Sequence, residues 1–240
     1  MRIDLFKILL SSLILAGIIS CQQAIDLSPV YYKQGNELYD KGKFQEAIDK
    51  YTEAIEANSS NQNYYFNRGS AYFAIGNYEF AIKDYTHVLQ LFPQNSVALK
   101  SRGSSYFNIG LNDRAIDDFS QALQINPRDT EALNNRAYVK TSIKDFTSAF
   151  EDYSRAIELD TTNSILYFNR GSVLDSLKQF EGAIENYTQA LHISADNPQN
   201  FISRGLSLIQ LGKNEEACED FNSAFKIDST AIVFLNKFCK

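Results

Sequence analysis

The sequence has no tryptophan, one methionine, two histidines, three cysteines and four prolines in 240 residues. The two histidines, His87 and His192, are isolated from each other and from cysteine, so we expect both at the surface and no metal site. No Ser/His/Asp set and no glycine-rich phosphate loop is present either. The sequence therefore predicts a protein that catalyses no reaction and uses no cofactor.

Positive charge is also scarce, with 23 Lys and Arg against 29 Asp and Glu, a formal net charge of −6. An acidic chain without basic clusters argues against nucleic acid as a partner and against electrostatic binding to anionic lipid. The chain contains 17 Phe and 14 Tyr but few prolines. This composition is that of a folded protein rather than a disordered one.

Long hydrophobic runs are absent except at the N-terminus, where Ile8 to Ile19 is uncharged and follows Arg2 and Lys7. As a helix this run would be about 18 Å long, well short of a hydrocarbon core of about 30 Å. We therefore expect a secretory signal segment over residues 1–20 rather than a transmembrane helix.

The residues Ile18-Ile19-Ser20-Cys21 resemble the lipobox of bacterial lipoproteins. The resemblance implies cleavage before Cys21, lipidation of Cys21, and a short tether over residues 21–27. It places the protein at the bacterial cell envelope, and the absence of an acidic residue at Gln22 and Gln23 favours the outer membrane. An ordinary signal peptide with a nearby cysteine, or an uncleaved anchor, are the alternatives.

The other two cysteines, Cys218 and Cys239, show no metal-ligand spacing. We expect two unpaired thiols, and a disulfide between them is the alternative in an oxidising compartment. Cys218 takes a position that is isoleucine in four other copies of the repeat described next, so we place it in the core.

The same pattern of residue types repeats along the chain at one fixed interval, which is the number of positions from Ala47 to Ala81. Three sets of positions keep this period without an insertion, and we call them the alanine, glycine and aromatic lanes. The alanine lane is Ala47, Ala81, Ala115, Ala149, Ala183 and Ala217. The glycine lane is Gly35, Gly69, Gly103, Gly171 and Gly205, with Ala137 in the fourth copy. The aromatic lane is Tyr51, Tyr85, Phe119, Tyr153, Tyr187 and Phe221.

Each copy has the pattern of a helical hairpin, because apolar residues recur at helical spacing on both sides of a turn. The turn is marked by Gly42, Gly76, Gly110 and Gly212, and Pro93 and Pro127 follow second helices. Small residues in the alanine and glycine lanes allow the two helices of a hairpin to approach closely. We expect the aromatic lane to fill the space beside that contact.

This pattern resembles the tetratricopeptide repeat, a unit of about 34 residues with two antiparallel helices. The resemblance implies an all-α fold, a right-handed superhelical α-solenoid of six hairpins with a C-terminal capping helix over residues 229–240. The six units cover residues 28–61, 62–95, 96–129, 130–163, 164–197 and 198–231. The usual tryptophan is Tyr, Phe or Leu here, and the fourth unit is the least regular, with Ala137 and Lys140.

Arginine recurs at 68, 102, 136, 170 and 204, and aspartate at 84, 118, 152 and 220. An anion-binding ladder is one interpretation of this pattern. We favour a partly buried, hydrogen-bonded scaffold, because Arg and Asp change together in the first unit, to Gln34 and Lys50. Whether each pair lies within a unit or between units stays open.

In tetratricopeptide repeat proteins the first helices line a concave groove that holds segments of partner proteins. The resemblance assigns to this groove Asn36, Phe66, Asn67, Phe73, Lys100, Phe107, Asn135, Tyr138, Phe168 and Asn169. Asn and Ser there can bond to an extended backbone, and aromatic residues supply apolar area. Stacking within the solenoid is the alternative role of these aromatics. A two-Asn, three-cation carboxylate clamp, known in some relatives, is absent, because Tyr32, Val97 and Ser101 take the cationic places.

The sequence thus predicts a membrane-tethered scaffold that docks peptide segments or helices of other proteins. Two alternatives are an accessory subunit of a cell-envelope enzyme or secretion complex, and a groove carrier of a glycan or lipid. A cytoplasmic adaptor would require the N-terminal interpretation to be wrong.

Overall fold

The computed structural model describes residues 26–239, and this part of the chain is helical. The predicted signal segment and Cys21 lie outside the described residues. The first helices of the six hairpins are α2 (Ser28–Asp40), α4 (Gln62–Ala74), α6 (Ser96–Asn108), α8 (Thr130–Ser142), α10 (Ser164–Ser176) and α12 (Pro198–Gln210). The second helices are α3 (Phe44–Ala57), α5 (Tyr78–Leu91), α7 (Asn112–Ile125), α9 (Phe146–Leu159), α11 (Phe180–Ile193) and α13 (Asn214–Ile227). The short helices η1 (Ser229–Ala231) and α14 (Ile232–Phe238) follow.

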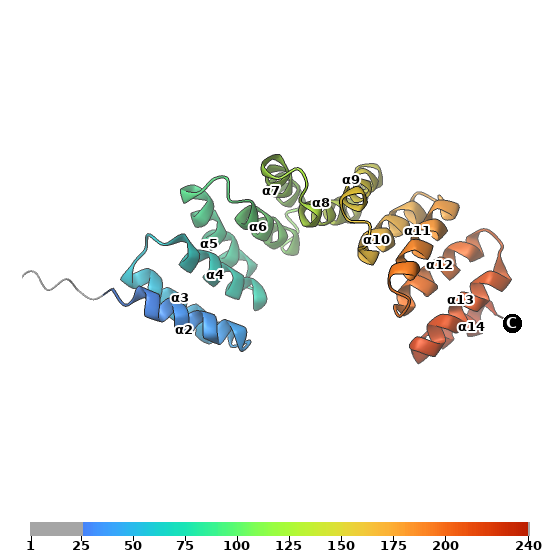
Figure 1. Ribbon diagram of the computed structural model, residues 1–240, viewed down its shortest axis with the longest axis horizontal. Helices are drawn as coiled ribbons and strands as arrows, with labels where there is room; N and C mark the ends of the chain where they lie inside the picture. Colours follow the sequence, from blue (N-terminus) through green and yellow to red (C-terminus); the bar gives the residue numbers. More distant parts are fainter. Residues whose placement is uncertain (1–25, 240) are drawn as a thin grey trace, which may run out of the picture.

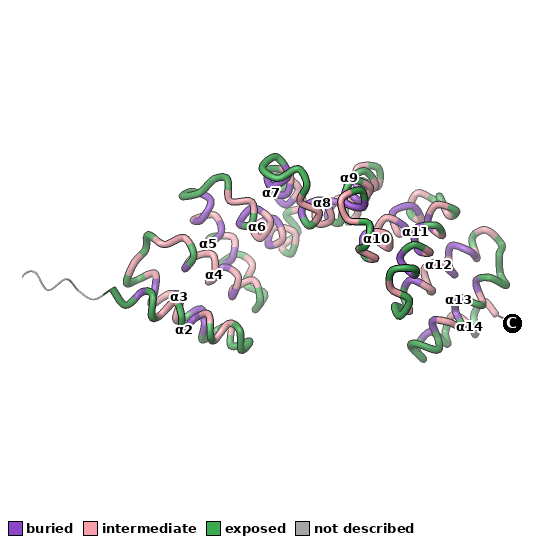
Figure 2. Tube along the Cα trace, in the orientation of Figure 1, coloured by how far each residue is buried: buried purple, intermediate pink, exposed green. Residues whose placement is uncertain are grey.

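The hairpins stack one after another along an arch, with α7, α8 and α9 at its crown (Figure 1). The first helices α6, α8 and α10 lie on the inner side of the arch, and α7, α9 and α11 on the outer side. The α-solenoid of six hairpins with a capping helix is therefore confirmed. Buried residues lie between neighbouring helices along the whole arch rather than in one central core (Figure 2).

Asparagine or aspartate caps the first helix of units two to six. Each cap side chain accepts a hydrogen bond from a backbone N–H two or three residues further on, which satisfies a donor that the helix itself leaves free. These caps are Asn61, Asn95, Asp129, Asn163 and Asn197. They recur with the period of the repeat and fix the point at which each hairpin begins.

The turn inside each hairpin needs a left-handed backbone. Gly42, Gly76, Gly110 and Gly212 have φ values between 74° and 79°, a region that glycine enters without steric cost. Lys144 and Lys178 take the same place in units four and five, with φ of 65° and 59°. The turn geometry is thus kept in all six hairpins even where glycine is replaced.

The three lanes meet inside each hairpin. Every alanine of the alanine lane is fully buried, and the aromatic lane is at most 2% exposed. A Cβ atom built on Gly171 would lie 2.8 Å from Cε1 of Tyr187, and one on Gly205 would lie 2.6 Å from Cε1 of Phe221. The glycine lane, with Gly69 and Gly103, is therefore the surface on which the aromatic rings rest.

The expectation of two unpaired thiols is wrong, because a disulfide joins Cys218 and Cys239. Helix α14 folds back onto α13, and Phe234 and Phe238 stack on Phe221 with ring centroids 5.5 and 5.6 Å apart. This packing brings the Cα atoms of the two cysteines to 5.7 Å, a distance that a disulfide spans. Cys218 is half-buried at this contact rather than in the core.

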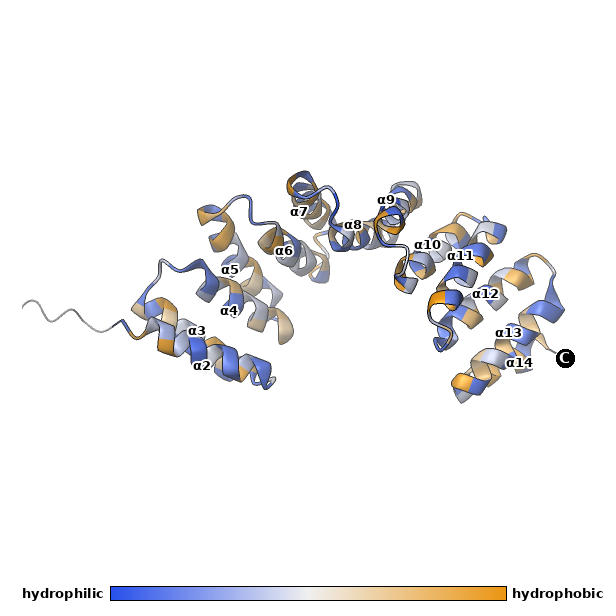
Figure 3. Ribbon diagram, in the orientation of Figure 1, coloured by the Kyte–Doolittle hydropathy of each residue, from blue (hydrophilic) through white to orange (hydrophobic). Residues whose placement is uncertain are grey.

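Hydrophobic and hydrophilic residues are interspersed along the ribbon (Figure 3). Within residues 26–239, no helix combines the length and the apolar character needed to cross a bilayer. The same residues hold no group of three or more His, Cys, Asp or Glu side chains arranged for a metal ion.

Candidate functional site

Each arginine of the predicted ladder joins three helices. In the second unit, Nε and Nη2 of Arg68 donate to the two carboxylate oxygens of Asp84 at 2.9 and 2.8 Å. Its Nη1 donates to Oγ1 of Thr52, on the second helix of the preceding unit, at 3.1 Å. The same geometry recurs at Arg102, Arg136 and Arg204. The pairs therefore lie within units, and the guanidinium groups are used in the scaffold.

The electrostatics of the ladder differ from unit to unit. Burial raises the pKa of Asp84, which receives a single cation. Burial acts in the same direction on Asp152, but hydrogen bonds from Arg136 and Lys140 outweigh it and hold the pKa of Asp152 below its usual value. Lys140, the irregular residue of unit four, thus adds a second ion pair to the buried carboxylate.

The fifth unit, which the structure describes in full, has an amide in the ladder in place of the carboxylate. Nε of Arg170 donates to Oδ1 of Asn186 at 2.8 Å, and Nη1 donates to Ser154 at 3.2 Å. Burial lowers the pKa of Arg170, whose guanidinium donates to neutral acceptors rather than to a carboxylate. A neutral amide is therefore tolerated where units two, three, four and six hold aspartate.

His87 is half-buried, which corrects the expectation of a surface residue. Its ring lies against Tyr65 with centroids 3.9 Å apart, and its Nε2 atom has no hydrogen-bond partner among the described residues. His192 is exposed, as expected. The aromatic contact, formed between α4 and α5, was not visible in the sequence because Tyr65 and His87 lie on different helices, far apart along the chain.

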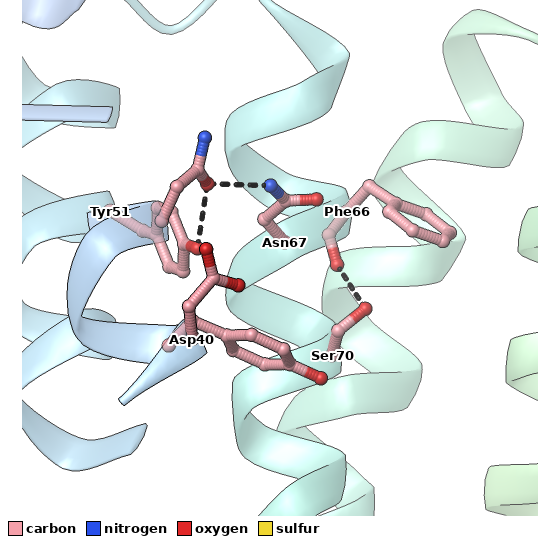
Figure 4. A pocket seen from close by; sticks show the side chains of 7 residues that line it. Asp40, Tyr51, Phe66, Asn67 and Ser70 are labelled. Atoms are coloured by element: carbon pink, nitrogen blue, oxygen red, sulfur yellow. Dashed lines mark hydrogen bonds between the residues drawn. The ribbon is translucent and has the colours of Figure 1, made fainter. Parts of the chain in front are cut away.

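The inner face, formed by the first helices, holds a cavity of about 450 Å³ between the first and second hairpins, which we call cavity A. Figure 4 shows Asp40, Tyr51, Phe66, Asn67 and Ser70 around it. Asn36 and Tyr39 complete the lining. Three of the predicted groove residues, Asn36, Phe66 and Asn67, are therefore brought together.

The amides of cavity A hold each other in place. Oδ1 of Asn36 accepts hydrogen bonds from the Tyr51 hydroxyl at 2.8 Å and from Nδ2 of Asn67 at 2.9 Å (Figure 4). Nδ2 of Asn67 also donates to the Tyr32 hydroxyl at 3.0 Å. Burial raises the pKa of Tyr51, so its hydroxyl stays a donor. This network fixes the side chains before any partner arrives.

A second cavity on the inner face, cavity B, has a volume of about 240 Å³ and spans hairpins two to four. It contains the predicted groove residues Phe73, Phe107, Asn135 and Tyr138. The rings of Phe107 and Tyr138 meet edge to face with centroids 5.5 Å apart, and Tyr138 is 53% exposed. Tyr138 therefore presents a large ring to solvent at the edge of a preformed hollow.

Three predicted groove residues serve the solenoid itself. Lys100 is half-buried and forms ion pairs with Asp129, at 3.0 Å, and with Glu131 of the next unit. Phe168 packs on Tyr187 with ring centroids 5.6 Å apart. Asn169 donates to Oδ1 of Asn134 at 3.2 Å. For Phe168, stacking within the solenoid is the role that the structure gives.

Asp175, on α10, is a half-buried carboxylate of the inner face. It accepts hydrogen bonds from the Tyr187 hydroxyl and from Oγ of Ser207, both at 2.7 Å. Burial raises its pKa despite these donors. The bond from Ser207 connects the fifth hairpin with the sixth, whereas the bond from Tyr187 lies within the fifth hairpin.

The sequence interpretation missed the charged residue of cavity A and one lane of the scaffold. Asp40 occupies a repeat position that is Ala, Asn, Ser, Ser and Gln in the later units, and its unique charge was the available signal. The hydroxyl lane that receives Nη1 of each arginine recurs once in each of units one to five, at the period of the other lanes, whereas the sixth unit has Asn222 there. It consists of Thr52, Thr86, Ser120, Ser154 and Thr188.

Family models described as TPR repeat or tetratricopeptide repeat match the chain over residues 35–76, 63–95, 101–164, 165–197 and 199–230. No curated protein matches the chain.

Among solved structures, MamA is 27% identical, with a TM-score of 0.65 over 68% of this chain and 95% of that chain. YrrB, described as a TPR protein with an unusual peptide-binding site, is 21% identical with a TM-score of 0.65, covering 78% of this chain and 97% of that chain. PilF of Pseudomonas aeruginosa is 14% identical with a TM-score of 0.71, covering 85% and 93%. At their identities, the likenesses to YrrB and PilF show a common fold.

Proposed function

Because the chain belongs to the tetratricopeptide repeat family, we propose that it binds segments of other proteins on its inner face and catalyses no reaction. The observation that carries this proposal is the pair of preformed hollows, cavities A and B, on successive first helices. Both are lined by aromatic and amide side chains, which supply apolar area and backbone hydrogen bonds to a peptide. The peptide-binding site of YrrB, which shares the fold, is consistent with this use.

Several polar side chains around cavity A are held by hydrogen bonds before binding, which favours affinity. Tyr85, whose pKa burial raises to about 12, donates from the core to Ser70 of cavity A at 3.2 Å. Tyr51 does the same to Asn36. Ordering these groups costs little when a partner binds, because the hydrogen bonds already exist.

Replacing Tyr138 with alanine is expected to weaken peptide binding about tenfold, since tyrosine is enriched among interface hot spots and a bound peptide would bury this exposed ring. Peptides are first selected on the full chain from a random phage-displayed library, and their affinity is then measured by isothermal titration calorimetry. Phe80→Ala is the matched control, because Phe80 is 50% exposed but lies on the second helix α5. Equal affinities for wild type and Tyr138→Ala would contradict docking at cavity B.

We further propose that Cys21 is lipidated and holds the protein at the bacterial cell envelope, at the outer membrane. The support is the lipobox-like sequence before Cys21 and the stable anchoring that several acyl chains give. The partners are then other proteins of the envelope.

Intact mass spectrometry of the membrane fraction tests the anchor. We expect a mass that lacks residues 1–20 and includes acyl chains, and we expect the Cys21→Ala variant to lose these chains and leave the membrane fraction. Full-length, unmodified protein in the soluble fraction would refute the anchor and leave the proposed binding on the inner face untouched.

A further inference from the structure

Cavity A differs from cavity B in holding a formal charge. Asp40, the last residue of α2, lines it and is exposed. Within residues 26–239, no Lys or Arg forms an ion pair with Asp40. The carboxylate therefore faces a hollow of about 450 Å³ with its charge uncompensated by a neighbour.

Most hydrogen-bond donors of cavity A are already used. The Tyr51 hydroxyl donates to Asn36, both hydrogens of Asn67 Nδ2 are taken, and Oγ of Ser70 donates to the carbonyl oxygen of Phe66 at 3.0 Å. Three donor hydrogens remain, two on the Asn36 amide and one on the Tyr39 hydroxyl. A carboxylate guest that used them would also be repelled by the charge of Asp40.

Cavity A also contains hydrogen-bond acceptors that no donor occupies. Both oxygens of Asp40 and Oδ1 of Asn67 have no donor among the described residues. The rings of Tyr39 and Phe66 also line the hollow, and the faces of aromatic rings attract cations. A negative group, a neutral acceptor and aromatic faces around one hollow are the surroundings that a guanidinium or ammonium group prefers.

We propose that cavity A binds an arginine or lysine side chain of the partner segment, with Asp40 as its counter-ion. This inference rests on the proposed function, because it supposes that a protein segment lies on the inner face. The inference specifies one residue of that segment, which is basic and lies between the first and second hairpins. The acidic net charge of the chain, −6, favours the same class of partner.

The test uses a random phage-displayed library of short peptides, selected in parallel on the full wild-type chain, Asp40→Asn and Glu37→Gln. Glu37 is the matched control, because it is an exposed carboxylate on the same helix α2 but does not line cavity A. We expect Arg or Lys at one fixed position in peptides from wild type and Glu37→Gln, and no such position in peptides from Asp40→Asn.

Calorimetry on one selected peptide then measures how much the ion pair between its basic residue and Asp40 contributes to affinity, apart from the rest of the interface. Replacing its basic residue with the neutral isostere citrulline, or with norleucine for lysine, should weaken binding to wild type about tenfold, a typical effect of losing a charge-assisted hydrogen bond. The same replacement should change binding to Asp40→Asn less than about twofold.

Two other results would overturn the proposal in different ways. Peptides that depend on Tyr138 but carry no basic position would refute the role of cavity A and leave docking on the inner face in place. Selected peptides that bind Tyr138→Ala, Asp40→Asn and wild type equally would refute both the basic residue and the proposed function.

Discussion

Replacing Arg102 with methionine is expected to lower the free energy of unfolding by about 3–5 kcal/mol, the usual cost of leaving a buried charge unpaired. Arg102 donates twice to Asp118, both bonds at 2.8 Å, and once to Thr86 at 3.1 Å. The Asp118 side chain is only 4% exposed, so water cannot replace the guanidinium. Urea unfolding followed by circular dichroism measures the loss.

Two further variants show whether the loss of stability in Arg102→Met comes from the unpaired charge of Asp118. Arg136→Met should be milder, because Lys140 still pairs with Asp152 at 2.8 Å. Asp118→Asn should also be milder, because it reproduces the Arg170–Asn186 contact of the fifth unit. Equal losses for Arg102→Met and Arg136→Met, with little loss for Asp118→Asn, would mean that removal of the arginine side chain itself, rather than the unpaired carboxylate, determines the effect.

Replacing Gly171 with valine is expected to cost about 3 kcal/mol through overpacking. The first added carbon would lie 2.8 Å from Cε1 and 3.0 Å from Cδ1 of Tyr187. That ring cannot move aside easily, since it is 1% exposed and its hydroxyl donates to Asp175 at 2.7 Å. Thermal unfolding by circular dichroism gives the change in stability.

Gly182 provides the matched comparison, because it is also a glycine within a helix. A Cβ atom there would meet Leu174 at 3.4 Å, an ordinary contact. Gly182→Ala should therefore stabilise the fold by up to about 1 kcal/mol, through the better helix propensity of alanine. A destabilising Gly182→Ala, or a neutral Gly171→Val, would show that close approach of the ring does not explain the glycine lane.

The hairpins could be predicted from the sequence because their contacts repeat with the chain. Gly69, Ala81 and Tyr85 lie close together in the sequence, and the same spacing in six units leaves one arrangement of helices that buries all three lanes. The pairing of each Arg with its Asp could not be predicted in this way. Asp84 lies almost midway between Arg68 and Arg102 in the sequence, so spacing alone allows contacts within or between units.

The candidate site was only partly predictable for a similar reason. Asn36 and Asn67 belong to different units, and their hydrogen bond depends on how two hairpins stack. Lys100 was assigned to the groove by its repeat position, but Asp129 and Glu131, from further along the chain, form ion pairs with it. The Cys218–Cys239 disulfide depends on the fold-back of α14, a contact outside the period of the repeat.

The arginine ladder also bears on how the solenoid would respond to a pulling force. Five arginines each connect their own hairpin to the second helix of the hairpin before it. They are Arg68, Arg102, Arg136, Arg170 and Arg204. Four of them grip a carboxylate with two hydrogen bonds, whereas Arg170 makes a single bond to Asn186. If the arch is stretched by its ends, we expect the fifth hairpin to deform more easily than the other four, because it has fewer bonds to its arginine. The resistance of the arch to stretching would then differ from unit to unit.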